Sequence, residues 1–220
     1  MSPSNREERM RSLELLVRRR YTDFEHGLPF HGWHHIEFVR AQAAELAAEN
    51  GADSFLVASA ALVHDLNYMV ERNSRAIEGS ELRRTTLEAA AFSDTEVELI
   101  EEIVLDAETS SRGASLSLEA QALSDADTLF KALPVTPVML AHRYMEETGQ
   151  SLSELCDEIL RFQLPLLDEG IYFYNARCRE LYSRWARVNL ELWESIRESL
   201  QSRPVAILVQ ELEADPGERQ

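Results

Sequence analysis

The 220-residue sequence contains six histidines, and four of them lie within ten residues, at His26, His31, His34 and His35. An imidazole binds transition metals and transfers protons near neutral pH, so this segment is a candidate site for either chemistry. His31 and His35 are four residues apart and share a face of any helix that already runs through Gly32. His34 would point elsewhere, and we expect both His34 and His26 to face solvent.

The His64-Asp65 pair is a second candidate. It directly follows residues 55–63, FLVASAALV, which are apolar on every side and predict a central helix that is buried all round. An unpaired carboxylate at the end of such a helix is costly, so Asp65 needs a cation or strong hydrogen-bond donors. Further along, Asp125 and Asp127 place two acids in another predicted helix. We interpret Asp125 as a helix cap or as a residue that orients a ligand.

Helical signals dominate the chain. The Ser-x-x-Glu spacing that typically begins a helix occurs at Ser4, Ser93 and Ser151, and apolar residues at helical spacing follow each of them. Alternation with a period of two, which is typical of strands, is nearly absent. The sequence therefore predicts an all-α protein. The expected helices cover residues 5–25, 33–49, 53–66, 75–92, 95–107, 117–131, 136–148, 152–164 and 174–201.

The domain organisation is predicted to be simple. No stretch has the composition of a linker, and no internal repeat is visible, so residues 1–213 are expected to form one compact helical domain. The last residues, 214–220, are polar and include Asp215-Pro216-Gly217, so we expect a disordered tail.

The ordered histidines and aspartates resemble the HD superfamily of metal-dependent phosphohydrolases, which is named for its His-Asp pair. A histidine opens a helix, His64-Asp65 ends a buried helix, and Asp127 follows in an Asp-Ala-Asp-x-Leu context. Residues 78–80, EGS, and a late stretch from 170 to 190 look like a bacterial subgroup of small HD proteins. The resemblance covers about residues 30–192 and implies a compact all-α bundle of the HD-domain type.

The resemblance implies four metal ligands, His35, His64, Asp65 and Asp127. Two neutral imidazoles and two carboxylates suit Mn, Fe, Co, Ni or Zn and tolerate Mg poorly. Two carboxylates leave a divalent ion near neutral, so it still attracts an anionic ester. Four protein ligands also leave water positions open on an octahedral ion, and a water acidified by the metal is the nucleophile that a phosphoester hydrolase needs.

The reaction implied is hydrolysis of a small phosphate monoester or a nucleotide. In this hypothesis Asp65 or Glu78 deprotonates the attacking water, and His31, Lys131 or an arginine stabilises charge on the transferring group. His31 has an alternative interpretation, because it would pack beside Trp33 without any role in the chemistry.

Three cationic side chains are candidate substrate contacts. Lys131 lies four residues after Asp127, so both project from one face of a helix. Simple solvation of the Lys131 ammonium is the alternative. Arg72 and Arg75, in the expected loop after the His-Asp helix, are rival phosphate contacts.

The chain departs from the dinuclear branch of the superfamily, which inserts further histidines after the His-Asp pair. No histidine occurs here between His64 and His142, so we expect one ion. We expect His142 itself to lie on a helix surface. A second ion would depend on Glu78, Asp106 or Asp125. Two other functions stay open: a metal-containing module that binds a nucleotide or metabolite without turnover, and redox chemistry at a di-iron centre.

The composition of the chain limits the classes of molecule that it is expected to bind. The 39 acidic residues outnumber the 22 basic ones, which gives a net charge of -17, and Lys131 is the only lysine. General binding to nucleic acid or anionic lipid is therefore not expected, because both need a positive field. No apolar run is as long as a membrane helix, and the start, MSPSNREERM, lacks the apolar stretch of a secretory signal, so we expect a cytoplasmic protein. The expected partner is a small phosphorylated molecule, and a homodimer is left open.

Overall fold

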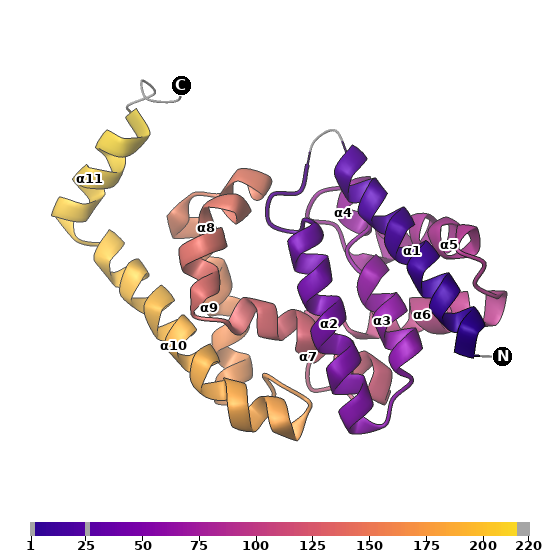
Figure 1. Cartoon of the computed structure of the whole chain (residues 1–220). Helices are drawn as coiled ribbons and strands as arrows, with labels where there is room; N and C mark the ends of the chain where they lie inside the picture. Colours follow the sequence, from indigo (N-terminus) through magenta and orange to yellow (C-terminus); the bar gives the residue numbers. More distant parts are fainter. Residues whose placement is uncertain (1–2, 25–26, 215–220) are drawn as a thin grey trace.

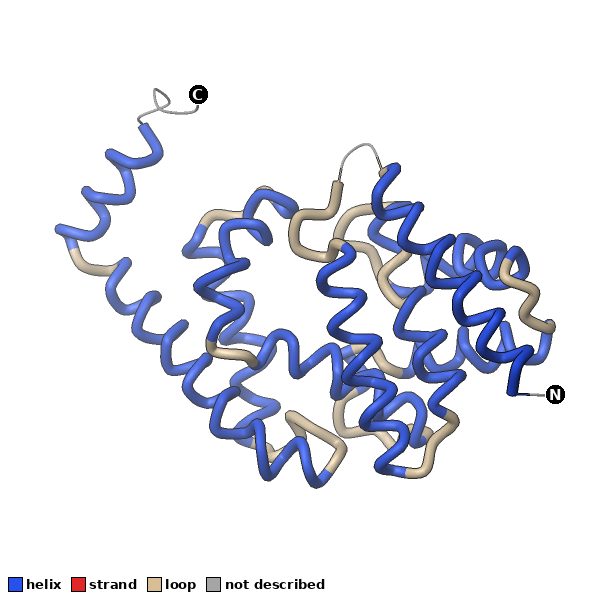
Figure 2. The backbone as a smooth tube through the Cα atoms, viewed as in Figure 1, coloured by secondary structure: helices blue, strands red, loops and turns tan. Residues whose placement is uncertain are grey.

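The computed structural model describes residues 3–24 and 27–214. The regular structure of these residues is entirely helical, which confirms the predicted all-α class (Figure 2). In chain order the elements are α1 (Pro3–Asp23), α2 (Trp33–Asn50), α3 (Ser54–Val63), α4 (Asn67–Val70), the 3-10 turn η1 (Ala76–Gly79), α5 (Ser80–Ala89), α6 (Asp94–Asp106), the 3-10 turn η2 (Thr109–Ser111), α7 (Leu118–Ala132), α8 (Val135–Thr148), α9 (Leu152–Asp168), α10 (Ala176–Leu200) and α11 (Arg203–Ala214).

Helix α3 forms the centre of the core, as its apolar sequence predicts. Every residue from Val57 to Val63 is buried. Helix α3 lies between α1 and α2 (Figure 1), and it also packs against α6 and α7. Helices α9 and α10 pack against each other, and α10 contacts α7 as well. Helix α7 therefore contacts both the helices around α3 and the α9–α10 pair, which it meets through α10.

Local sequence signals explain where several helices begin. Asp53 caps α3 by accepting hydrogen bonds from two backbone N–H groups of its first turn, and Arg6 of α1 donates to both carboxylate oxygens of Asp53. The predicted Ser-x-x-Glu boxes at Ser93 and Ser151 begin α6 and α9. The serine side chain of the third box, Ser4, lies outside the described residues.

The central helix is shorter than the sequence predicts, and this difference decides where the His-Asp pair lies. The predicted helix continues to residue 66, but α3 ends at Val63. The N–H of Leu66 then donates to the carbonyl of Val63 at 3.2 Å, which is a tighter turn than that of an α-helix. His64 and Asp65 therefore lie on a turn, and α4 begins just after it.

Two helices near the C-terminus also differ from the prediction. Helix α9 continues through Pro165 to Asp168, because a proline this close to the end removes only one of the last hydrogen bonds. Helix α11 was not predicted. The expected disordered tail lies outside the described residues except for Ala214, which is the last residue of α11. Within the described ranges, no helix combines the length and the apolar composition that crossing a membrane requires.

Candidate metal centre

His35 lies on the buried face of α2 and is fully shielded from solvent. The edge of its ring meets Phe130 of α7, with the ring centroids 4.6 Å apart. Burial lowers the pKa of His35, although the carboxylates of Asp65 and Asp127 oppose this effect. His35 is therefore a neutral imidazole near pH 7, which is the form that binds a metal ion.

His64 approaches the same point from the turn after α3. Its Nδ1–H donates to the carbonyl of Ala61 at 2.8 Å. This hydrogen bond leaves the lone pair on Nε2, which lies 3.2 Å from Nε2 of His35. The two imidazoles thus present their Nε2 atoms to one shared position.

Asp65 brings a carboxylate to both imidazoles. Its Oδ2 lies 3.0 Å from Nε2 of His35, and its Oδ1 lies 3.3 Å from Nε2 of His64. Burial by itself raises the pKa of Asp65, but the electrostatic interactions with His64 and His35 outweigh it and hold this pKa below its ordinary value. Oδ2 is buried and has no hydrogen-bond partner in the described part of the chain. A buried ionised oxygen of this kind is stabilised by a cation.

Asp127 completes the cluster from α7. Its Oδ1 lies 3.5 Å from Nε2 of His35, and its Oδ2 accepts a hydrogen bond from Nζ of Lys131 at 2.6 Å. Burial opposes ionisation, but the Lys131 ammonium and the neighbouring imidazoles lower the pKa of Asp127. One oxygen of Asp127 is thus held by its own helix while the other faces the histidines.

These donors fit a divalent metal ion. One ligand atom from each of His35, His64 and Asp127 lies within 4.8 Å of the others. Ligands about 2.1 Å from a shared ion lie roughly 3 to 3.5 Å from one another. The distances from Nε2 of His35 to the other three side chains, 3.0 to 3.5 Å, agree with that spacing. Imidazole nitrogens together with carboxylates suit a borderline or hard divalent ion.

A cavity of about 500 Å³ opens beside the cluster. Among the residues predicted to contact substrate, His31, Arg75 and Lys131 line it together with His64, Asp65 and Asp127. The side chain of Arg75 is 78% exposed, and its Nη2 lies 3.8 Å from the carboxylate of Glu108. The structure therefore brings two cationic side chains and a histidine to the same cavity as the metal cluster.

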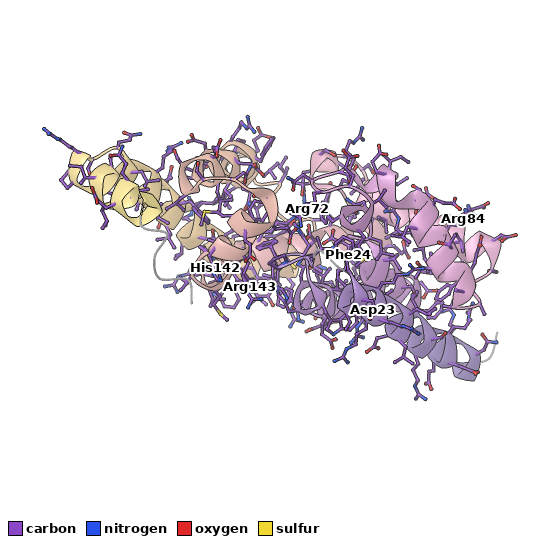
Figure 3. The ribbon with its side chains drawn as sticks, turned by 90° about the horizontal axis from the view of Figure 1, so that it is seen from above. Asp23, Phe24, Arg72, Arg84, His142 and Arg143 are labelled. Carbon is purple, nitrogen blue, oxygen red and sulfur yellow. The ribbon has the colours of Figure 1, made fainter. Side chains whose placement is uncertain are left out.

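Two other predicted site residues do not reach this cavity. Glu78 is exposed on η1 and is not part of the cavity wall. Arg72 lies in the loop after α4, near the middle of the molecule when it is seen from above (Figure 3). Its Nη1 donates to the backbone carbonyl of Glu147 at 3.1 Å. Arg72 thus ties this loop to α8 in the structure.

The remaining histidines lie away from the metal cluster. His34 and His142 are exposed, as expected, and Figure 3 shows His142 on α8. His26 lies outside the described residues. The cation–π partner of Trp33 is Arg18, 5.6 Å from its ring centre.

Glu147 is a buried residue at this site that sequence reasoning missed. Its Oε1 lies 2.5 Å from Nδ1 of His31, and its Oε2 accepts hydrogen bonds from the backbone N–H groups of Phe30 and His31 at 2.8 and 3.2 Å. Burial opposes ionisation, but the contacts with His31 lower the pKa of Glu147. The ring of His31 is further held against Tyr68, with centroids 4.2 Å apart. No local signal marks Glu147, because its partners are more than 110 residues away in the sequence.

Asp125 does not face the metal cluster. Its Oδ1 accepts hydrogen bonds from Arg112 and from the N–H of Tyr174, both at 2.8 Å, and its Oδ2 accepts one from the N–H of Asn175 at 2.6 Å. Burial raises the pKa of Asp125, and the Arg112 contact opposes this. Asp125 therefore fixes the start of α10 against α7, and the cap of α7 is Ser117.

The fold and the site together define an all-helical protein with a buried histidine–aspartate cluster at the junction of α2, α3 and α7. Residues 32–131 match the HD domain family, and this range contains the four side chains of the cluster. This segment of the chain is therefore similar to an HD domain, and HD domains belong to a superfamily of metal-dependent phosphohydrolases that bind divalent metals.

Solved structures with the same fold include proteins of three bacteria. YpgQ of Bacillus subtilis in complex with ADP superposes with a TM-score of 0.66 at 20% identity, and the match covers 90% of this chain and 98% of YpgQ. A Lactobacillus plantarum protein has a TM-score of 0.68 at 18% identity, with 90% and 98% covered. Lin1889 of Listeria innocua has a TM-score of 0.60 at 17% identity, with 92% and 97% covered. At these identities the likeness establishes the fold alone. Among curated proteins, none matches the sequence.

Proposed function

We propose that this protein is a metal-dependent phosphohydrolase that acts on a small phosphate monoester or a nucleotide. The observation that carries the proposal is the convergence of two imidazoles and two carboxylates beside a cavity that Arg75 and Lys131 also line. A cluster buried purely for stability would not need to border an open cavity, whereas a hydrolase needs access for its substrate.

One divalent ion, held by His35, His64, Asp65 and Asp127, is the proposed cofactor. Mn, Fe, Co, Ni and Zn suit this donor set better than Mg, which prefers oxygen ligands alone. Such an ion supplies Lewis acidity toward a phosphoryl oxygen and lowers the pKa of a bound water. The single ion is favoured because Asp125, a candidate ligand for a second one, is already occupied by Arg112 and two backbone N–H groups.

The surrounding side chains have separate roles in this proposal. Asp65 is placed to accept the proton of the attacking water, because its carboxylate borders the cavity. Lys131 and Arg75 attract the anionic phosphate into an otherwise acidic protein. His31, oriented by Glu147, stabilises the charge on the transferring group in this proposal.

A nucleotide is the favoured substrate class within this proposal. YpgQ of Bacillus subtilis, which has the same fold, was solved in complex with ADP. The cavity of about 500 Å³ falls within the range of pockets that take molecules of this size. Tyr68 in the cavity wall and Phe162 at 55% exposure offer aromatic surface to a base.

The test combines elemental analysis of the purified protein with a phosphatase screen. We expect about one divalent ion per chain and hydrolysis of at least one phosphate monoester or nucleotide when Mn, Fe, Co, Ni or Zn is supplied. Asp65→Asn should lower the turnover rate by about 100-fold or more, since it removes a ligand and the proton acceptor together. Asp157→Asn is the control, because this acid is exposed on α9 and lies outside the cavity wall.

Several outcomes would contradict the proposal. Protein that never binds a divalent ion has no cofactor for this chemistry. Nucleotides that bind but are never consumed would instead indicate a binding module. Two ions per chain, with loss of one in Asp106→Asn, would revive a dinuclear centre.

A further inference from the structure

Helix α10 carries an apolar stripe that its own chain leaves uncovered. Leu181, Trp185, Val188 and Leu192 are 46%, 42%, 44% and 36% exposed. Their spacings of four, three and four residues place them along one line of the helix, and this is the spacing of a coiled-coil seam. The opposite face of α10 is used in the core, where Trp193 is buried. Figure 1 shows α10 along one edge of the molecule.

Charge is divided unevenly along the same helix. The first half of α10, up to Val188, carries four arginines and one glutamate, whereas the second half carries three glutamates and one arginine. The charged residues are Arg177, Arg179, Glu180, Arg184 and Arg187, followed by Glu191, Glu194, Arg197 and Glu198. One end of the exposed helix is therefore basic and the other end is acidic.

Arg184 and Glu191 flank the apolar stripe on the same side, seven residues apart. Both are exposed, and neither forms an ion pair within the described part of the chain. In an antiparallel pair of helices related by a two-fold axis, flanking positions on the same side face each other across the seam. Position 184 of one helix then meets position 191 of the other, and this contact occurs twice. A parallel pair would instead bring the basic half of one helix against the basic half of the other.

We propose that this protein forms a homodimer through antiparallel packing of α10 against α10 of a second copy. The stripe is self-complementary under a two-fold axis, and the charge division suits only the antiparallel arrangement. The occupant is a second copy because the basic half of α10 matches its own acidic half.

Helix α11 supplies a further part of this interface. A specific dimer buries about 800 Å² on each chain, more than four half-exposed side chains provide. Helix α11 extends past the end of α10 and away from the body of the chain (Figure 1), with Ile207 and Leu208 at 48% and 56% exposure. Antiparallel pairing brings α11 toward the first turns of the partner's α10. Ile207 and Leu208 then pack against that part of the partner's helix.

Sedimentation equilibrium of the full chain tests the proposal. We expect twice the chain mass of 25.1 kDa at micromolar concentration. Val188→Arg places a charge at the centre of the seam in both copies and should weaken the dimer by about 100-fold or more. Leu15→Arg is the matched control, because Leu15 is 70% exposed on α1, away from the stripe, and this variant should remain dimeric.

Exchange of the charges at positions 184 and 191 tests whether the two α10 helices pack antiparallel, and it leaves the buried residues of the chain unchanged. Arg184→Glu and Glu191→Arg should each weaken the dimer, and the double variant Arg184→Glu/Glu191→Arg should restore it. A wild-type chain that stays monomeric overturns the proposal. A dimer that survives Val188→Arg uses another surface and also overturns it. Failure of the double variant to regain dimer strength, while its helical content is unchanged, excludes the antiparallel register.

Discussion

Glu147 connects α8 to the cavity through a single side chain. Its carboxylate is buried and binds the ring and the backbone N–H of His31 together with the N–H of Phe30. The hydrogen bond to Nδ1 directs the proton of the imidazole to that nitrogen, and the other nitrogen is left for the cavity. The orientation of His31 therefore depends on a residue that belongs to a different part of the chain.

Glu147→Gln should reduce turnover without removing the metal. The amide of glutamine keeps the size of the side chain and still accepts from backbone N–H groups, but it lacks the charge that strengthens the hydrogen bond to Nδ1 of His31. We expect kcat to fall about 10-fold, with the metal content unchanged. The measurements are steady-state kinetics and elemental analysis on the same preparations.

Glu146→Gln is the control for this substitution, because Glu146 is exposed one residue earlier on α8. If Glu147→Gln loses stability but keeps kcat, Glu147 acts only in packing. A drop in metal content equal to the drop in kcat would place its effect on the ligands rather than on His31.

At the scale of elements, α1 is fastened to α6 by one ion pair. Arg9 donates two hydrogen bonds to the carboxylate of Glu96, at 2.6 and 3.0 Å, and its guanidinium lies over the rings of Phe55 and Phe92. Glu96 also closes the capping box with Ser93. The Arg9 contact lowers the pKa of Glu96 from 4.5 to about 2.

This pair predicts a dependence of stability on pH. The pKa of Glu96 is lower in the folded state than in the unfolded state. The ionised Glu96 therefore adds its full contribution to the free energy of unfolding above about pH 4.5, and this contribution is lost as the pH falls toward 2. Since solvent reaches part of the pair, we expect a loss of about 1 to 2 kcal/mol over that interval. Chemical unfolding of wild type and Glu96→Gln between pH 6 and 2.5 measures it.

The difference in stability between wild type and Glu96→Gln should shrink as the pH falls. Glu98→Gln is the matched control, because Glu98 is exposed on the same helix. A difference that stays constant across the whole pH range would show that Glu96 stabilises the fold without its charge.

At the scale of the whole molecule, the metal cluster joins segments that are distant in the sequence. His35 comes from α2, His64 and Asp65 from the turn after α3, and Asp127 from α7. Without an ion, two carboxylates and two imidazoles are held within a few ångströms in a buried position. An ion that binds only the folded arrangement therefore stabilises the packing of all three helices.

Removal of the metal should lower the melting temperature. An ion present at 100 times its dissociation constant stabilises the fold by about 2.7 kcal/mol, which corresponds to roughly 5 to 10 °C for a chain of this size. Thermal unfolding with and without a chelator measures the change, and Asp127→Asn should respond little to the chelator. An equal shift in Asp127→Asn would mean that the stabilising ion binds elsewhere.

Much of the fold could be predicted because its signals are local. The capping boxes at Ser93 and Ser151 and the all-round apolar segment before His64 depend only on neighbouring residues. The His-Asp pair at the end of a buried helix also indicated where a cation is needed, since an isolated buried carboxylate is costly. Helix α11 was missed because no start signal of this type precedes it.

Only the tertiary structure decided which side chains share the cavity. Glu78 follows the His-Asp helix closely in sequence, but η1 packs tightly on α4, and a Cβ on Gly79 would lie 2.7 Å from the backbone nitrogen of Asn67. This packing leaves Glu78 exposed, whereas Glu147 reaches His31 from the far side of the chain. Local patterns determine helices and single residues, but the contacts between helices depend on packing over long sequence separations, which residue spacing along the chain does not encode.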